Sequence, residues 1–426
     1  DVSLSADGAI SNANGGVINF GYEGSGSLVM SAGDGIGADG AVLVTGAEGS
    51  VNVAAEADGD IVIDSSGGTE LTVAEIGDVS GISSASGDVT LAADDLEIGE
   101  SVSGARVTLT TSDTERLIDL GGAGGEGGLS LTEAELGNVS SDVIQIGDDA
   151  NDGGITVTDA VSFTDAGHDV AHLVTGGGDM SDDEASALQV DSLAISSSDG
   201  TVTLDGDNQV GTLAVDHSGA EGSVTFNDFD GLEVGSVDGI DGISAYDVTL
   251  STGGALTDDG VNNITAETLT VGGASSVGDI EAGLTVDASE VDITAGGNIV
   301  LDAVGEDGVL IAAAVVGDAG GIAIYSSSET VTLDGVSTED GHILVGVDTS
   351  IEALNVSAGT AAAADGDIIM LALGDITVGD VSAGDDLIAI GADGNINFIG
   401  GDEGADVGGG NSTLTLAAGG DISFDG

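Results

Sequence analysis

The sequence predicts an all-β solenoid, in which short strands stack coil upon coil. Three observations favour this fold. Short segments of alternating apolar and small polar residues recur along all 426 residues, corners rich in Gly and Asp separate them, and proline is absent. Corners at roughly ten-residue spacing are typical of short stacked strands. Strands that pair with neighbours above and below need every backbone N–H, which proline lacks.

The strand segments share one pattern. Two apolar residues flank a small polar residue, and this alternation of period two indicates a strand with one buried face. The clearest examples are Val42–Val44, Ile61–Ile63, Val89–Leu91, Ile155–Val157, Val202–Leu204, Val248–Leu250, Leu269–Val271, Val331–Leu333, Ile376–Val378 and Leu414–Leu416.

The corners between strands explain the 76 glycines. Glycine adopts positive φ without steric cost, and Asp tolerates turns by bonding its own backbone. Solenoid precedent predicts about 20 residues per coil or somewhat more, with two or three strands in each. A barrel or a sandwich fits less well, because the pattern runs almost uniformly along the chain.

We expect one domain, a continuous solenoid over residues 1–426. Looser stretches near residues 121–128, 176–187 and 400–411 are predicted to be insertions that loop out of the coils. The chain begins at Asp1 without Met, which indicates a processed form or a piece of a longer protein.

Composition limits the partners. Apolar residues make up 41% of the chain and aromatic residues 2%, so the core must be narrow and aliphatic. The net charge of −75 leaves no basic surface, which excludes nucleic acid and disfavours anionic membranes. The longest apolar run, Val309–Val316, is too short for a transmembrane segment. Self-repulsion of this charge favours a medium rich in salt or cations.

Some segments resemble the repeats of filamentous haemagglutinin-like exoproteins of the two-partner-secretion type. The similar segments are Glu115–Gly122, Leu131–Leu136, Gly222–Asp228 and Val237–Ile243. The resemblance implies a right-handed parallel β-helix, forming a single elongated rod. It also implies export by a partner-dependent route, an extracellular or cell-surface location, and an adhesive or matrix role.

Acidic pairs are the candidate metal ligands. Hard cations such as calcium and magnesium prefer oxygen ligands. The pairs are Asp148 and Asp149, Asp182 and Asp183, Asp258 and Asp259, and Asp385 and Asp386. The competing interpretation is a solvated acidic surface with a diffuse cloud of ions. No cofactor is required, and calcium or another divalent cation is the one expected ligand.

Two histidines lie four residues apart, at positions 168 and 172, with Asp165 and Asp169 nearby. On a helix they could share a metal ion, whereas in strands and loops they need not converge. We expect two polar loop histidines. Carboxylate pairs carry no catalytic signal among 77 acids, and only Arg106 and Arg116 could hold an anionic sugar, so we expect no enzyme.

Three functional hypotheses remain, given in order of preference. The first is an extracellular structural protein, a subunit or segment of a self-assembling filament or of a biofilm or surface matrix fibre, whose partners are copies of itself joined end to end. Unpaired strand edges at the ends of a solenoid would be the assembly device. The alternative is an adhesin shaft that binds glycans or a host surface, and an acid-based glycosidase is a distant third.

Overall fold

A computed structural model confirms the β-solenoid. Strands make up 63% of the protein and helices 2%, and parallel strands stack through about 17 turns. The described residues are 1–20, 26–37, 40–45, 49–67, 69–122, 128–183, 186–261, 263–279, 282–305, 307–317, 320–328, 330–359, 366–384, 386–399 and 413–425. The chain divides into two compact units, which are described separately: Asp1–Gly222 with Val237–Ile240, and Ser223–Ser236 with Asp241–Gly426.

The first unit contains twenty-four strands and two single-turn helices among its described residues. The strands are β1 (Val2–Ala6), β2 (Val17–Asn19), β3 (Gly26–Ala32), β4 (Val42–Thr45), β5 (Ser50–Ala57), β6 (Ile61–Ser65), β7 (Glu70–Val73), β8 (Glu75–Ile76), β9 (Val79–Ser80), β10 (Ile82–Ser84), β11 (Val89–Ala93), β12 (Leu96–Ile98), β13 (Val102–Ser103), β14 (Arg106–Thr110), β15 (Leu117–Leu120), β16 (Gly128–Leu131), β17 (Val139–Ser140), β18 (Val143–Gly147), β19 (Ile155–Val157), β20 (Val161–Ser162), β21 (Val170–Thr175), β22 (Met180–Asp182), β23 (Leu188–Ser197) and β24 (Val202–His217). The helices are α1 (Glu133–Leu136) and α2 (Phe163–Ala166).

The second unit has the same architecture. Its strands are β25 (Ser223–Asp228), β26 (Leu232–Val234), β29 (Ile243–Ser244), β30 (Asp247–Thr252), β31 (Ala255–Asp258), β32 (Ile264–Ala274), β33 (Ser276–Val277), β34 (Leu284–Ala295), β35 (Ile299–Ala303), β36 (Val309–Val315), β37 (Ile322–Ser326), β38 (Thr330–Thr338), β39 (Ile343–Val347), β40 (Ser350–Ala358), β41 (Ile368–Ala372), β42 (Ile376–Ala383), β43 (Leu387–Ala392), β44 (Ile396–Ile399), β45 (Thr413–Ala418) and β46 (Ile422–Asp425). The short strands β27 (Ser236–Val237) and β28 (Ile240–Asp241) pair with each other.

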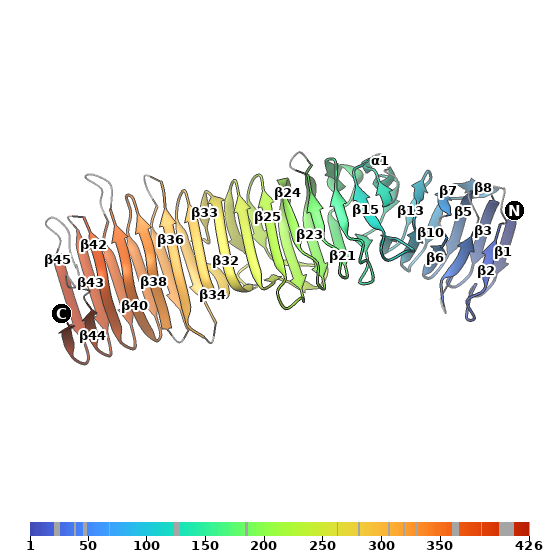
Figure 1. The fold of residues 1–426 in the computed structure, drawn as a ribbon. Helices are drawn as coiled ribbons and strands as arrows, with labels where there is room; N and C mark the ends of the chain where they lie inside the picture. The colour runs from blue at the N-terminus through green and yellow to red at the C-terminus, as the bar shows by residue number, and fades with distance from the viewer. Residues whose placement is uncertain are drawn as a thin grey trace. The chain divides into compact units, whose positions relative to one another are not determined.

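The strands of the second unit lie side by side in successive coils (Figure 1). The coil length follows from the pairing along one ladder of these strands. Parallel pairing places the following residues on successive coils: Ile299, Ile322, Ile343, Ile368, Ile388 and Leu414. The differences between these numbers are 23, 21, 25, 20 and 26 residues. Between two such positions the chain forms two strands, for example β39 and β40. The predicted coil length and strand count are therefore confirmed here.

The core is a stack of aliphatic side chains. Inward positions in this ladder, from Ile299 to Ile388, are at most 2% exposed. Because identical or similar side chains lie one coil apart, each layer is covered by the next, and burial of apolar surface stabilises the stack by roughly 25 cal/mol per Å². Aromatic residues are rare in it, and Phe163 and Phe226 are the largest fully buried side chains among the described residues.

The structure describes only parts of the three predicted insertions. Residues 400–411 lie outside the described residues, as do 123–127 of the first insertion. The stretch 176–187 contains β22, which pairs with β19 and β24, so this part belongs to the coil. Residues 184–185 again lie outside the described chain. Across the described ranges, no helix is long and apolar enough to cross a membrane.

Candidate functional site

A tight hairpin, whose residues 237–240 belong to the first unit, carries a polar side chain with two charged or ionisable partners. β27 and β28 are joined by Asp238 and Gly239, both with positive φ, at 50° and 83°. An Asp-Gly pair favours such a two-residue turn, because Gly has no Cβ to strain and Asp tolerates this conformation. We call residues 236–241 the hairpin. Its turn holds the Asp238 carboxylate at the tip.

The hairpin rests on small side chains that point outward from the coils. Ala194 on β23 and Ala214 on β24 occupy outward positions of their strands, yet both are 0% exposed. They pack with Val237, and the half-buried Val170 and Ile240 complete the cluster. An alanine at each outward position leaves room for the hairpin, whereas a larger side chain would push it away.

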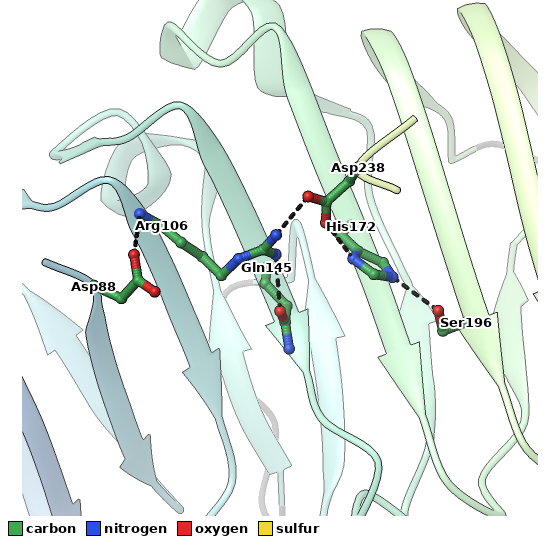
Figure 2. A network of polar contacts seen from close by, with 6 residues as sticks. All are labelled: Asp88, Arg106, Gln145, His172, Ser196 and Asp238. Atoms are coloured by element: carbon green, nitrogen blue, oxygen red, sulfur yellow. Dashed lines mark hydrogen bonds and ion pairs between the residues drawn. The ribbon is translucent and has the colours of Figure 1, made fainter. Parts of the chain in front are cut away.

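Two cationic or potentially cationic side chains hold the tip (Figure 2). The Arg106 guanidinium donates to Asp238 Oδ1 and also to Gln145 Oε1, at a distance of 3.0 Å. His172 Nδ1 lies 2.7 Å from Asp238 Oδ2, and His172 Nε2 lies 2.9 Å from Ser196 Oγ. Gln145 and His172 are ladder neighbours on β18 and β21, so the stacking of coils brings these groups together.

The environment sets the protonation states of this network. Burial lowers the pKa of His172, although the hydrogen bond and the charge of Asp238 oppose this shift. Burial alone would raise the pKa of Asp238, but hydrogen bonds from Arg106 and His172 outweigh it, and the net pKa is lowered. The network therefore pairs an ionised carboxylate with a neutral imidazole, whose Nδ1–H donates to Asp238 and whose Nε2 accepts a hydrogen bond from the Ser196 hydroxyl.

The order of acid, imidazole and hydroxyl is that of a hydrolase triad. Catalysis also needs a substrate cleft and donors for the developing oxyanion. Three cavities, of about 660, 520 and 490 Å³, are lined by other residues. Arg106 binds the tip of the hairpin, and Ala194 and Ala214 pack beneath it. The geometry therefore supports a structural role, in which the network holds the hairpin against the coils.

Several carboxylates of the predicted acidic pairs accept hydrogen bonds from backbone amides or hydroxyls. Asp148 accepts from Thr110 Oγ1 and Ala150 N, and Asp182 accepts from the amides of Asp205 and Gly206. Burial raises the pKa of Asp182 above its ordinary value, and these hydrogen bonds oppose the shift without cancelling it.

Three further carboxylates of these pairs accept hydrogen bonds from backbone amides. Asp258 accepts from the amides of Gly260 and Thr285, Asp259 from Val261, and Asp386 from Gly366. The side chain of Asp149 is exposed, the backbone N–H of Asp183 bonds to Ser186, and Asp385 lies outside the described residues. Among the residues described, no three His, Cys, Asp or Glu side chains gather as metal ligands would. Cation binding at these pairs stays a prediction.

The two neighbouring histidines have separate partners. His168 is 1% exposed and its Nε2 lies 3.1 Å from the carbonyl oxygen of Leu136, whereas His172 contacts Asp238. The expectation of a loop position was wrong for His172, which belongs to β21. Its strand was missed because the apolar residues Ala171 and Leu173 flank a histidine instead of a small polar residue.

The two arginines form ion pairs, as expected of lone cations in an acidic chain. Arg116 Nε lies 3.9 Å from Asp94 Oδ2. Arg106 reaches a partner 132 residues away in sequence.

Comparisons with models of known protein families, with curated proteins and with solved structures find no match to this chain.

Proposed function

We propose that this protein is an extracellular structural subunit that stacks end to end into a filament or matrix fibre. One observation carries the proposal: parallel strands stack through about 17 turns with aliphatic ladders, so a coil of one copy could cover a coil of another in the same way. The fold class and the uniform repetition of aliphatic ladders support the same role.

The edge formed by β45 and β46 is the clearest case. β45 pairs with β43 and β46 pairs with β44, each in parallel register. Leu414, Ile422 and Phe424 continue the core ladders but are 43%, 42% and 71% exposed. A strand edge with unpaired backbone groups and adjacent apolar side chains is a template for a further parallel strand.

Strands β1 and β2 of the first unit offer matching chemistry. β1 pairs in parallel with β3, and β2 with β4. The inward residues of these strands, Val2 and Leu4 on β1 and Ile18 on β2, are half-buried. Because all these ladders are parallel, the β45 and β46 edge of one copy can add to the β1 and β2 edge of the next copy without reversing direction.

The charge of the chain suits a fibre that stays dispersed. Seventy-seven acidic side chains on 426 residues repel neighbouring fibres at low salt. Dissolved cations screen this repulsion. The resemblance to filamentous haemagglutinin-like exoproteins adds the expectation of a secreted, partner-dependent export route.

The experiment is negative-stain electron microscopy with light scattering on the 426-residue chain, across a series of salt concentrations. We expect filaments that lengthen with protein concentration. A Phe424→Lys, Leu414→Lys double variant should remain as single particles, because charge on an edge blocks strand addition. The matched control is Leu310→Lys, at a 37% exposed position on β36 away from both edges. Particles of one copy under all conditions would contradict the proposal.

A further inference from the structure

The second unit carries an outward face without charge. Strands β37, β39, β41, β43 and β45 pair in this order, and their outward residues form two columns across the coils. The columns are Ala323, Leu344, Ile369, Ala389 and Thr415, and Tyr325, Gly346, Leu371, Gly391 and Ala417. We call these ten residues the apolar face. It ends at β35, where Asp302 precedes Tyr325 in the second column.

This face departs from the usual alternation of inward apolar and outward polar residues. Alternation normally places an apolar residue inside and a polar one outside. Here the inward residues of β41, Ile368 and Met370, are 0% exposed, yet the outward Leu371 is also apolar and 52% exposed. Tyr325 is 45% exposed. A gathered apolar surface on a chain with a net charge of −75 marks an interaction site more strongly than scattered exposed residues do.

The second column forms a groove. Gly346 and Gly391 stand on either side of Leu371, so the large side chains alternate with positions that have none. A Cβ atom at Gly391 would lie 3.0 Å from Leu371 Cδ2, which shows that the leucine leans over the glycine. The resulting cavity measures about 660 Å³ and also contacts Leu373, which is 60% exposed.

Carboxylates border this groove. Asp348 follows β39 and Asp393 follows β43, and both line the cavity. Along the other ends of the strands, Asp367 and Asp386 precede β41 and β43. An occupant therefore meets an apolar centre with negative charge at both margins.

A second copy of this chain does not match these margins. It contains no Lys, and its two arginines are engaged with Asp238 and Asp94. Two chains that each carry a charge of −75 would place acidic margins against each other. We propose that the apolar face binds a polypeptide segment of a different protein, one that has apolar side chains for the groove and Lys or Arg on their flanks.

The test uses fluorescence anisotropy at about 150 mM salt, where exposed charges are screened beyond roughly 8 Å. The probe is a labelled synthetic peptide of alternating Leu and Lys. A peptide of alternating Ser and Lys has the same charge and measures attraction to the acidic chain as a whole. We expect the Leu–Lys peptide to bind at least about tenfold more tightly, a difference that a few buried apolar groups produce.

Variants locate the site. Leu371→Ser and Tyr325→Ser should each weaken the Leu–Lys peptide about tenfold and leave the Ser–Lys peptide unchanged. The matched control Val316→Ser alters a residue that is 58% exposed but outside the apolar face, and it should bind like the parent chain. Equal binding of the two peptides, or loss of binding in the control alone, would overturn the proposal. Binding of a neutral cello-oligosaccharide that depends on Leu371, with no preference for the Leu–Lys peptide, would overturn it in favour of a carbohydrate.

Discussion

The rings of Phe398 and Phe424 stack face to face, with centroids 4.7 Å apart and planes inclined by 6°. They are ladder partners on β44 and β46. Isolated aromatic pairs prefer offset or edge-to-face arrangements, but the spacing of parallel strands, about 4.8 Å, imposes this parallel stack. Phe398 is 3% exposed and Phe424 is 71% exposed, so one ring is covered and the far side of the other is open.

Replacement of these two rings should have unequal effects. Phe398→Ala removes a buried side chain and should cost about 3–5 kcal/mol in the free energy of unfolding of its coil. Phe424→Ala should cost about 0.5–1.5 kcal/mol, the worth of an aromatic contact. The stability of a solenoid is approximately a sum of contacts between neighbouring coils, so each effect should stay local. Hydrogen exchange of residues 396–399 and 422–425 measures it. Equal protection losses in the two variants would show that Phe424 is more deeply packed than its exposure indicates.

The hairpin should depend on its ion pair. Arg106→Leu leaves the buried side of Asp238 without its strongest donor, and hydrogen bonds to charged groups contribute about 1.5–3 kcal/mol. We expect hydrogen exchange of residues 236–241 to accelerate by roughly one to two factors of ten, since 1.4 kcal/mol corresponds to one factor of ten. Core strand β23 should keep its protection.

A serine variant distinguishes fastening from catalysis at the same network. Ser196→Ala removes the hydroxyl at the far side of His172 and leaves the Arg106–Asp238 pair intact, so hairpin exchange should change little. The parent chain should also fail to react with a fluorophosphonate that labels activated serines. Covalent labelling of Ser196 would contradict the structural role assigned to the network.

Much of the fold follows from local patterns in the sequence, whereas the hairpin site does not. Val331 and Leu333 are inward and 0% exposed, as the alternation indicates. The capped turn α1 had a signal that was overlooked: Thr132 and Glu135 bond reciprocally, as Thr and Glu three residues apart often do. The pairing of Arg106 with Asp238 spans 132 residues, and no local pattern encodes that distance. Ala194 and Ala214, apolar at outward positions, were the available clue.

The hairpin should loosen as pH falls from 7 to 5. The pKa of His172 is lowered in the folded protein, mainly by burial, from an ordinary value of about 6.5. Below that value the opened state takes up a proton more readily than the closed state, so stability present above about pH 6.5 is lost as pH falls. The groups that face His172 are Asp238, Arg106, Asp149 and Ser196.

Hydrogen exchange of residues 236–241, corrected for the intrinsic effect of pH, is the measurement. His172→Gln should remove the dependence in this window, because the pKa of Asp238 is lowered and that carboxylate titrates only at more acidic pH. A variant that keeps the full dependence would assign it to another group.

Asp302 on β35 should make stability depend on pH in the opposite direction, with stability lost as pH rises. Burial, helped by the charge of Asp258, raises the pKa of Asp302. The folded state then binds a proton more tightly than the unfolded state, and stability is lost as pH rises through the raised pKa. Asp302→Asn should therefore raise the Tm at pH 7, and the gain should disappear near pH 4. Asp292→Asn, at an exposed position on β34, measures the general benefit of removing one negative charge and should give a smaller gain.

Calcium and sodium should separate a specific cation site from general screening. A net charge of −75 predicts that the Tm rises with NaCl, because the Debye length shrinks from roughly 30 Å at 0.01 M to 10 Å at 0.1 M. If Asp148 and Asp149 or the other acidic pairs hold calcium, millimolar CaCl₂ in a background of about 0.15 M NaCl should raise the Tm further, since a ligand that binds only the folded state stabilises it. Asp182→Asn and Asp258→Asn should then reduce the calcium effect and leave the NaCl effect intact. A Tm that follows ionic strength alone would reduce the acidic pairs to a solvated surface.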